Sequence, residues 1–365
     1  MSGALPLVIY HDWTCVHDQS ESELQLEQLL NSLKSHSTRW ESLTLQAPSW
    51  LIWDLDAMDL PSLREAIVEI DWFVYDVPFP RILDFLAKAP SLRRLEVAAY
   101  GTDTHSEVPK STFALPALRS LTSLSLDMSG VHVSGPETLS TLNHCATSIT
   151  QLKLNVRLTH ALAGHVQLPV LRVLDLGGSA SRILAHVTTP HLQELSVYKT
   201  VQWDPMPTLL TFLTRTQQLR RLTLGDVFTE NRATFLDCLE RMDDLRSLCV
   251  QEHTPSSPLL TQNILARMTC IDAPALLQPV KQPTPLSVSS ADSPTSLPGS
   301  GQSKLLLPSL TAIKVVVRMH GLEQWADAQT ALYDMLASRR ETRVCGTRVV
   351  AALQDVDTKM DRDVT

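Results

Sequence analysis

One pattern of apolar residues, L-x-x-L-x-L, returns at intervals of roughly two to three dozen residues through most of this chain. Its second and third apolar positions are separated by one residue, so they point to the same side of an extended strand. A unit of this kind cannot bury its apolar side alone, so the copies have to stack on one another. The clearest copies are Leu92/Leu95/Val97, Leu171/Leu174/Leu176, Leu192/Leu195/Val197, Leu219/Leu222/Leu224 and Leu245/Leu248/Val250.

Weaker copies extend the array in both directions. They are Trp40/Leu43/Leu45, which we expect to be the first strand, Leu63/Ala66/Val68, Leu121/Leu124/Leu126, Ile149/Leu152/Leu154 and Leu310/Ile313/Val315. Several strands follow a proline-containing turn, and segments with helical spacing of apolar residues lie between them at 23–33, 79–86, 207–213 and 232–242. This order predicts an α/β fold, a leucine-rich-repeat solenoid (horseshoe) of about ten irregular repeats. Its parallel strands are expected on the concave side and its helices on the convex side.

We expect a single leucine-rich-repeat domain over residues 1–353, because a repeat array of this length forms one continuous core. It opens with a helix and the first strand in residues 20–45 and closes with a last repeat and a helix in residues 305–345. The asparagine that follows the strand in many such repeats is missing, which predicts irregular curvature. We expect the protein to be a monomer.

Two segments lack the repeated pattern. Residues 272–304 interleave prolines and serines, a composition that predicts a disordered insertion. A phosphorylation site at Ser293-Pro294 is the alternative to an insertion without a role. Residues 354–365 are polar and are predicted to be a flexible tail.

Composition excludes several classes of function. The net charge of −8 and the pI of about 5.8 argue against nucleic-acid binding, which requires a basic surface. No apolar run approaches the roughly 20 residues that cross a bilayer, so we expect no membrane contact. The six cysteines show no C-x-x-C pair. This favours reduced thiols and a cytoplasmic or nuclear protein.

No motif for phosphate binding, nucleophilic catalysis or zinc binding occurs in the chain. We therefore expect no enzymatic activity, no cofactor and no metal site. His160, His165, His186 and His191 lie at equal spacing in two neighbouring repeats. Because no cysteine or carboxylate joins them in the sequence, histidines of solvated turns are favoured over metal ligands.

The residues that alternate with the leucines should face outward from the sheet. They are small, polar and mixed in charge, which is typical of a surface that binds protein rather than of a simple phosphate-binding track. A sheet face that only contacts water is the alternative. The predicted partner-binding residues on this face are Arg94, Glu96, Asp127, Lys153, Asp175, Glu194, Tyr198 and Arg221.

An aromatic cluster follows the first two predicted strands, in a chain that is only 5% aromatic. Trp72, Phe73 and Tyr75 belong to it, together with Trp50 and Trp53. Aromatic side chains in loops are frequent anchors of protein interfaces, so we include the first three among the predicted partner-binding residues. The alternative is that the cluster packs as a cap over the first repeats.

An arginine recurs directly after the first leucine of five copies, which would form a ladder along one edge of the array. The ladder would either bind an acidic partner or pair with acidic residues of the chain, and pairing is the favoured interpretation. The arginines are Arg64, Arg93, Arg172, Arg220 and Arg246, and the acidic candidates are Glu65, Glu96, Asp226 and Asp243.

Three stretches resemble fungal F-box/leucine-rich-repeat proteins. Ser35-His-Ser-Thr-Arg-Trp40-Glu-Ser-Leu43-Thr-Leu45 is similar to the opening strand of that family. Asn263–Met268 with Leu306–Leu310 is similar to its penultimate helix and strand, and Leu332–Arg340 to its closing helix.

The resemblance implies the substrate-binding half of a cullin-RING ubiquitin ligase, in which an F-box holds a Skp-type adaptor and the repeats hold a protein substrate. Only Leu5-Pro6 of the F-box pattern precedes the first predicted helix. A Skp-type adaptor is therefore expected as a partner only if an F-box is supplied upstream. The alternative is a free-standing leucine-rich-repeat scaffold or regulator without a link to ubiquitin ligases.

Overall fold

The computed structural model describes residues 5–11, 28–29, 31–48, 52, 55, 58–72, 83–101, 115–159, 161–200, 203–216, 218–252, 259–270, 305–319, 326–345 and 348–362. It contains a 12-stranded sheet in which every neighbouring pair of strands is parallel. Across the sheet the strands are β1 (Leu7–His11), β2 (Trp40–Pro48), β3 (Glu65–Trp72), β4 (Arg94–Gly101), β5 (Ser123–Ser134), β6 (Gln151–Thr159), β8 (Val173–Gly177), β10 (Glu194–Thr200), β11 (Arg221–Val227), β12 (Ser247–Glu252), β13 (Ala312–Met319) and β16 (Asp355–Arg362). The chain therefore has an α/β fold built on one large parallel sheet.

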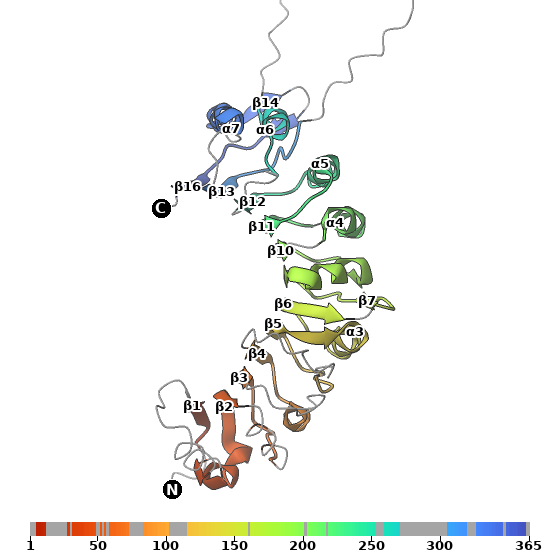
Figure 1. Cartoon of the computed structure of the whole chain (residues 1–365), viewed down its shortest axis with the longest axis vertical. Helices are drawn as coiled ribbons and strands as arrows, with labels where there is room; N and C mark the ends of the chain where they lie inside the picture. Colours follow the sequence, from red (N-terminus) through yellow and green to blue (C-terminus); the bar gives the residue numbers. More distant parts are fainter. Residues whose placement is uncertain are drawn as a thin grey trace, which may run out of the picture.

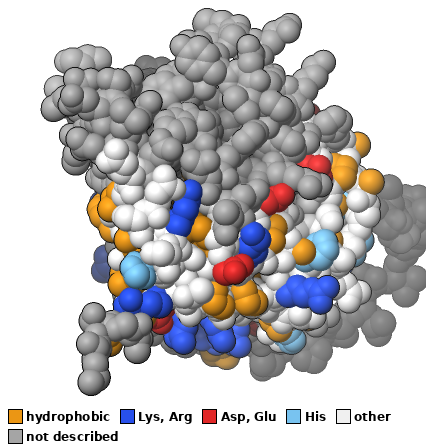
Figure 2. All heavy atoms as spheres, turned by 90° about the horizontal axis from the view of Figure 1, so that it is seen from below, with side chains coloured by type: hydrophobic (Ala, Val, Ile, Leu, Met, Phe, Trp, Pro, Cys, Tyr) orange, Lys and Arg blue, Asp and Glu red, His pale blue; other side chains and the backbone are white. Residues whose placement is uncertain are grey.

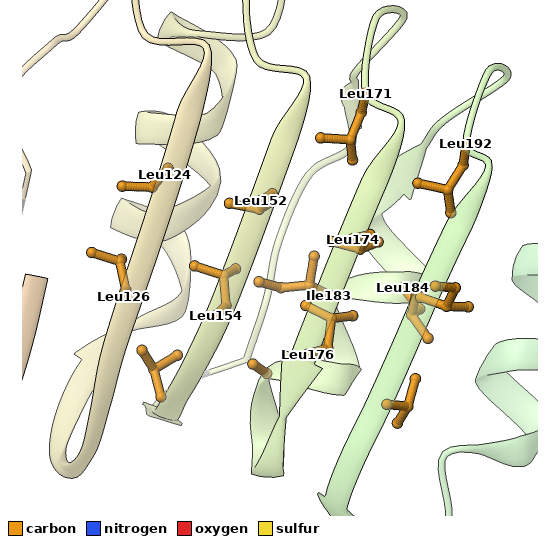
Figure 3. Close-up of a cluster of buried hydrophobic side chains, with 14 of the residues drawn as sticks. Leu124, Leu126, Leu152, Leu154, Leu171, Leu174, Leu176, Ile183, Leu184 and Leu192 are labelled. Atoms are coloured by element: carbon orange, nitrogen blue, oxygen red, sulfur yellow. The ribbon is translucent and has the colours of Figure 1, made fainter. Parts of the chain in front are cut away.

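The leucines of neighbouring strands lie in register. Leu152 of β6 pairs with Leu174 of β8, which pairs with Leu195 of β10, and each side chain is 1% exposed. Figure 3 shows such rows of leucines on successive strands, with Ile183 and Leu184 packed beside them. Each fully buried leucine contributes about 1.5–3 kcal/mol to folding, so these rows form the core. The strands predicted from the apolar pattern are confirmed.

The helices lie on one side of the sheet. The sheet lines the inner side of an arc and the helices form its outer side (Figure 1). The α-helices are α3 (Gly135–His144), α4 (Met206–Leu213), α5 (Arg232–Glu240), α6 (Gln262–Met268) and α7 (Ala326–Ser338), and 3₁₀-helices are η2 (Ser37–Arg39), η4 (Asp84–Lys88) and η5 (Gly178–His186). Two short parallel strands, β7 (Val166–Gln167) and β9 (Val187–Thr188), pair outside the main sheet.

The helix predictions met with different outcomes. The helices predicted at 207–213 and 232–242 are present as α4 and α5. The short helix predicted at 79–86 is present in its described part as the 3₁₀-helix η4, which begins at Asp84 and ends at Lys88. Helix α3 was not predicted, although Ser134 caps it by accepting a hydrogen bond from the Glu137 N–H and Pro136 stands in its first turn.

A ladder of main-chain hydrogen bonds crosses the sheet where the strands begin. For example, the N–H of Arg172 donates to the carbonyl oxygen of Thr150, and the N–H of Gln193 donates to that of Arg172. Serine hydroxyls reinforce this ladder: Ser120 Oγ donates to the Leu92 carbonyl at 2.8 Å, and Ser148 Oγ donates to the Leu121 carbonyl at 2.7 Å. These hydroxyls join neighbouring units in a sequence that lacks the asparagine after the strand.

The array begins earlier than predicted. Strand β1 precedes β2 and pairs with it, so the prediction that the strand at Trp40 is the first was wrong. The apolar pattern fails in β1 because this edge strand has a neighbour on one side only. Its Val8 and Tyr10 are each 72% exposed, whereas Ile9 is buried in the core and Leu7 packs partly against it.

The array also ends later than predicted. Residues 354–365 are not a flexible tail in their described part, because β16 pairs with β13 from Asp355 to Arg362. In the register of the two strands, Val356 lies opposite Ile313 and Thr358 lies opposite Val315. A polar threonine at the third position concealed this last copy. The insertion predicted at 272–304 lies outside the described residues.

The segment 305–345 holds β13 and α7, and a hairpin that was not predicted follows them. The hairpin consists of β14 (Arg343–Cys345) and β15 (Arg348–Val350), which are antiparallel. Its Val344 and Val349 are each 67% exposed. The hairpin therefore presents apolar side chains at the surface near the carboxyl-terminal end of the array.

Two cysteines form a disulfide. Cys270, directly after α6, is bonded to Cys345 of β14, with a sequence separation of 75. The prediction that all cysteines are reduced thiols was therefore wrong. The two positions lie far apart in sequence and without motif spacing, so only the packing of α6 against the end of the array brings them together. Cys145 and Cys238 are buried free thiols, as small apolar residues would be.

Candidate functional site

The middle of the inner face of the sheet gathers four of the predicted partner-binding residues. One row across the strands runs through Asp127, Asn155, Gly177 and Tyr198, each residue paired with the next. A parallel row pairs Lys153 with Asp175. Side chains of both rows point away from the leucine core because they alternate with the leucines along each strand. We call Asp127, Lys153, Asn155, Asp175 and Tyr198 the inner-face cluster.

Gly177 shapes this cluster. A Cβ at this position would lie 2.5 Å from Asn155 Oδ1 and 2.7 Å from Tyr198 Cε2. The Tyr198 ring and the Asn155 amide therefore occupy the space that the glycine leaves open. Asn155 Nδ2 also donates a hydrogen bond of 2.7 Å to Asp127 Oδ1, which fixes the orientation of the amide.

Asp175 lies beside these groups, and Oδ1 of its carboxylate is buried without a hydrogen-bond partner among the described residues. Burial raises the pKa of Asp175, and the positive charge of Lys153 opposes that effect. Burial also raises the pKa of the Tyr198 hydroxyl, with further contributions from the negative charges of Asp175 and Asp127. The cluster thus holds an acceptor atom that the chain itself leaves unsatisfied.

The other predicted residues of the inner face neutralise one another. Arg94 lies 3.2 Å from a Glu65 carboxylate oxygen and 3.4 Å from one of Glu96. Arg221 lies 2.9 Å from a Glu194 carboxylate oxygen. These are exposed ion pairs between neighbouring strands or along one strand, and each contributes at most about 1 kcal/mol. They flank the inner-face cluster and are not part of it.

The aromatic cluster falls largely outside the described residues. Phe73 and Tyr75 lie outside them. Trp72 is the last residue of β3, and the structure describes its backbone but not its side chain. Whether these side chains anchor an interface or cap the array stays a prediction.

The recurring arginines are neighbours, but most lack the partners predicted for them. The main-chain N–H of Arg93 donates to the Arg64 carbonyl, and that of Arg246 donates to the Arg220 carbonyl. Arg64 pairs with Glu41 at 3.3 Å. Among the described residues, the side chains of Arg93, Arg172, Arg220 and Arg246 have no ion pair, and all four are exposed.

The expected acidic partners are used elsewhere: Glu65 and Glu96 pair with Arg94, and Asp243 pairs with Arg348. The favoured prediction, that the recurring arginines pair with these carboxylates, was wrong. Figure 2 shows Lys and Arg side chains gathered along the lower rim of the face in view.

Two buried residues with ionisable side chains were not predicted from the sequence. Arg339, at the end of α7, is 0% exposed and donates three hydrogen bonds to main-chain carbonyl oxygens. Glu252, at the end of β12, is 8% exposed and accepts a hydrogen bond of 2.6 Å from the Leu259 N–H. Burial raises the pKa of Glu252 to about 7. Arg339 belongs to the stretch Leu332–Arg340 that resembles a closing helix, but this resemblance did not indicate that its side chain is buried. Glu252 belongs to no motif.

The histidines occupy separate turns. His165 Nε2 lies 2.6 Å from the Thr188 hydroxyl, and His186 Nδ1 lies 2.9 Å from the Gly164 carbonyl. His160 lies outside the described residues. Within the described part of the chain, no group of three His, Cys, Asp or Glu side chains is placed to hold a metal ion. In the same part, no helix has the length and apolar character needed to span a membrane.

No protein-family model matches the chain, and no curated protein matches it.

Proposed function

We propose that this chain is a leucine-rich-repeat solenoid whose concave inner face binds a protein partner without catalysing a reaction. Three observations support the solenoid. The L-x-x-L-x-L copies lie in register, the strands follow chain order across the sheet, and the helices lie on the outer side of the arc. An arc of this kind leaves one face of its sheet open to a second molecule.

The observation that carries the proposal is the unsatisfied Asp175 Oδ1 within the inner-face cluster. A buried acceptor without a hydrogen bond costs about 1–3 kcal/mol. A donor from a partner would recover that cost once the Asp175 side chain turns its carboxylate toward the open face. The Tyr198 ring beside it offers the flat, rigid side chain that is frequent at the centre of protein interfaces. The flanking Arg94 and Glu194 ion pairs supply a polar rim around this centre.

The test is capture of partners from a cell extract by the full chain, followed by crosslinking mass spectrometry. Asp175→Asn and Tyr198→Ala should lose the partners that the wild-type protein retains. Thr223→Ala, which changes a residue of the same face outside the cluster, should retain them. Crosslinks should map to the inner strands. Partners retained by all three variants, or crosslinked to the helices, would refute an inner-face site.

Within this function we propose a substrate-binding role like that of fungal F-box/leucine-rich-repeat proteins. The similarity of residues 35–45, 263–268 and 332–340 to that family supports it, since these residues include most of β2, most of α6 and the second half of α7. A free-standing scaffold or regulator is the alternative. The sequence of the transcript upstream of residue 1 distinguishes them: an F-box encoded there supports the substrate-binding role, and a transcript without one supports the free-standing scaffold. We expect no binding of this chain itself to a purified Skp-type adaptor.

A location in the cytoplasm or nucleus is part of this proposal. The Cys270–Cys345 disulfide is the observation that opposes it, because reducing compartments disfavour such bonds. Fluorescence microscopy of the tagged chain tests the location directly.

A further inference from the structure

Five exposed arginines follow the edge of the sheet at which its strands begin. Arg93, Arg172, Arg220 and Arg246 occupy the same position in their units, and Arg119 lies in the turn before β5. We call these residues the basic rim. Neighbouring positions of the main-chain ladder are one strand spacing apart, about 4.8 Å, so Arg220 and Arg246 are direct neighbours.

The basic rim is not neutralised by the part of the chain that the structure describes. Among the described residues its members form no ion pair and no side-chain hydrogen bond. This contrasts with the inner face, where Arg94 and Arg221 each pair with a glutamate. In a chain with a net charge of −8, a row of unpaired guanidinium groups is a local feature and not a consequence of composition.

A hollow of about 640 Å³ lies at the carboxyl-terminal part of the basic rim. Its lining combines Arg220 and Arg246 with apolar side chains of Pro308 and Val349. Val349 belongs to the β14–β15 hairpin and is 67% exposed. The hollow thus places guanidinium groups next to apolar side chains, so one bound ligand would contact both.

The charges around the hollow favour an anionic ligand. Asp244 also lines it, but two guanidinium groups outweigh this carboxylate. The neighbouring Asp243 is paired with Arg348 at 3.2 Å and contributes little negative field. Guanidinium groups bind carboxylates through paired N–H donors, which suits an acidic side chain better than a neutral one.

We propose that this hollow binds an acidic peptide segment of a partner protein. Carboxylates of the segment contact Arg220 and Arg246, and an apolar side chain of the segment packs against Val349 and Pro308. A nucleic acid fits less well, since the described lining holds no aromatic side chain on which a base could stack. The hollow is separate from the inner-face cluster, and the proposal does not depend on the function proposed there.

The test measures fluorescence anisotropy of a short labelled peptide rich in Glu with a single Leu, added to the full chain. Wild-type protein should bind it, and binding should weaken as salt is raised. The double variant Arg220→Gln/Arg246→Gln should bind about tenfold or more weakly, because two charge-assisted contacts are removed. The matched control Arg93→Gln/Arg119→Gln removes the same charge from the same rim outside the hollow and should retain most of the affinity.

A third variant tests whether positive charge in the hollow favours peptide binding. Asp244→Asn removes the opposing carboxylate and should tighten peptide binding, whereas weaker binding would contradict the proposal. Equal losses in the two double variants would show a nonspecific charge effect and overturn the assigned site. Absence of peptide binding would overturn it as well. So would tighter binding of a single-stranded oligonucleotide that is lost in Arg220→Gln/Arg246→Gln.

Discussion

Arg339 Nε donates a hydrogen bond of 2.8 Å to the carbonyl oxygen of Met268, which lies 71 positions earlier in the chain. Two further donors of the same guanidinium reach the carbonyls of Leu306 and Leu307, each at 2.8 Å. One buried side chain therefore joins the end of α6, the turn before β13 and the end of α7. Burial lowers the pKa of Arg339 to about 10, so the group stays charged at neutral pH.

Arg339→Met should destabilise the protein by roughly 3–5 kcal/mol, because three buried carbonyl oxygens lose their donors. Chemical denaturation followed by circular dichroism measures the change. Arg340→Met, at the exposed neighbouring position, is the control and should change stability by less than about 0.5 kcal/mol. Equal stabilities of the two variants would show that the hydrogen bonds of Arg339 do not hold this end together.

Glu252 should make stability depend on pH between about 4.5 and 7. Its pKa in the folded protein is about 7, raised from 4.5 by burial, so the folded state binds the proton more tightly than the unfolded state. This contribution is present in full below pH 4.5 and is lost as the pH rises through 7, with a total of about 3 kcal/mol at most.

Glu252→Gln should remove that dependence while keeping an acceptor for the Leu259 N–H. The melting temperature of the variant should exceed that of wild type at pH 8 by more than it does at pH 5. Glu230→Gln, at an exposed position, is the control. A difference between Glu252→Gln and wild type that is the same at both pH values would contradict the raised pKa.

Cutting the Cys270–Cys345 bond should lower stability. A disulfide that closes a long loop stabilises a protein by about 2–4 kcal/mol, mainly by restricting the unfolded chain. We expect the reductant dithiothreitol to lower the melting temperature of wild type and to leave Cys345→Ser unchanged. Alkylation and mass spectrometry should find both cysteines protected before reduction; full alkylation of native protein would show that the bond is absent.

Gly177→Ala should displace the Tyr198 ring and the Asn155 amide, because the added Cβ would lie 2.7 Å from Tyr198 Cε2 and 2.5 Å from Asn155 Oδ1. The displaced Tyr198 hydroxyl should lose burial, which is the main cause of its raised pKa, and its proximity to the negative charges of Asp175 and Asp127, so its pKa should fall toward the ordinary tyrosine range. A spectroscopic pH titration of the tyrosine hydroxyls measures this pKa. Ser125→Ala, on the same face, should not change it; an unchanged pKa in Gly177→Ala would place Tyr198 elsewhere.

The rows of leucines were predictable because their signal is local. Leu174 and Leu176 lie in β8, Leu171 lies in the turn before it, and the same spacing recurs in the next unit, so alternation alone identifies the buried side. The same alternation placed Asp127, Lys153, Asp175 and Tyr198 on the outward side of the sheet. Strands β1 and β16 were not predicted from the apolar pattern, because edge strands are less buried. Val8 of β1 and Val356 of β16 stay exposed, and no strict pattern is required there.

The sequence by itself thus determined that parallel strands stack through their leucines, since one repeated spacing forces one repeated contact. Only the tertiary structure decided which charges meet. Arg94 pairs with Glu65, whereas Arg220 and Arg246 have no ion pair among the described residues. The tertiary structure also decided that Cys270 meets Cys345. It also decided that Asp175 and Glu252 are buried. The physical reason is that an ion pair, a disulfide or a buried carboxyl depends on neighbours from distant parts of the chain. The periodicity of one strand does not specify those neighbours.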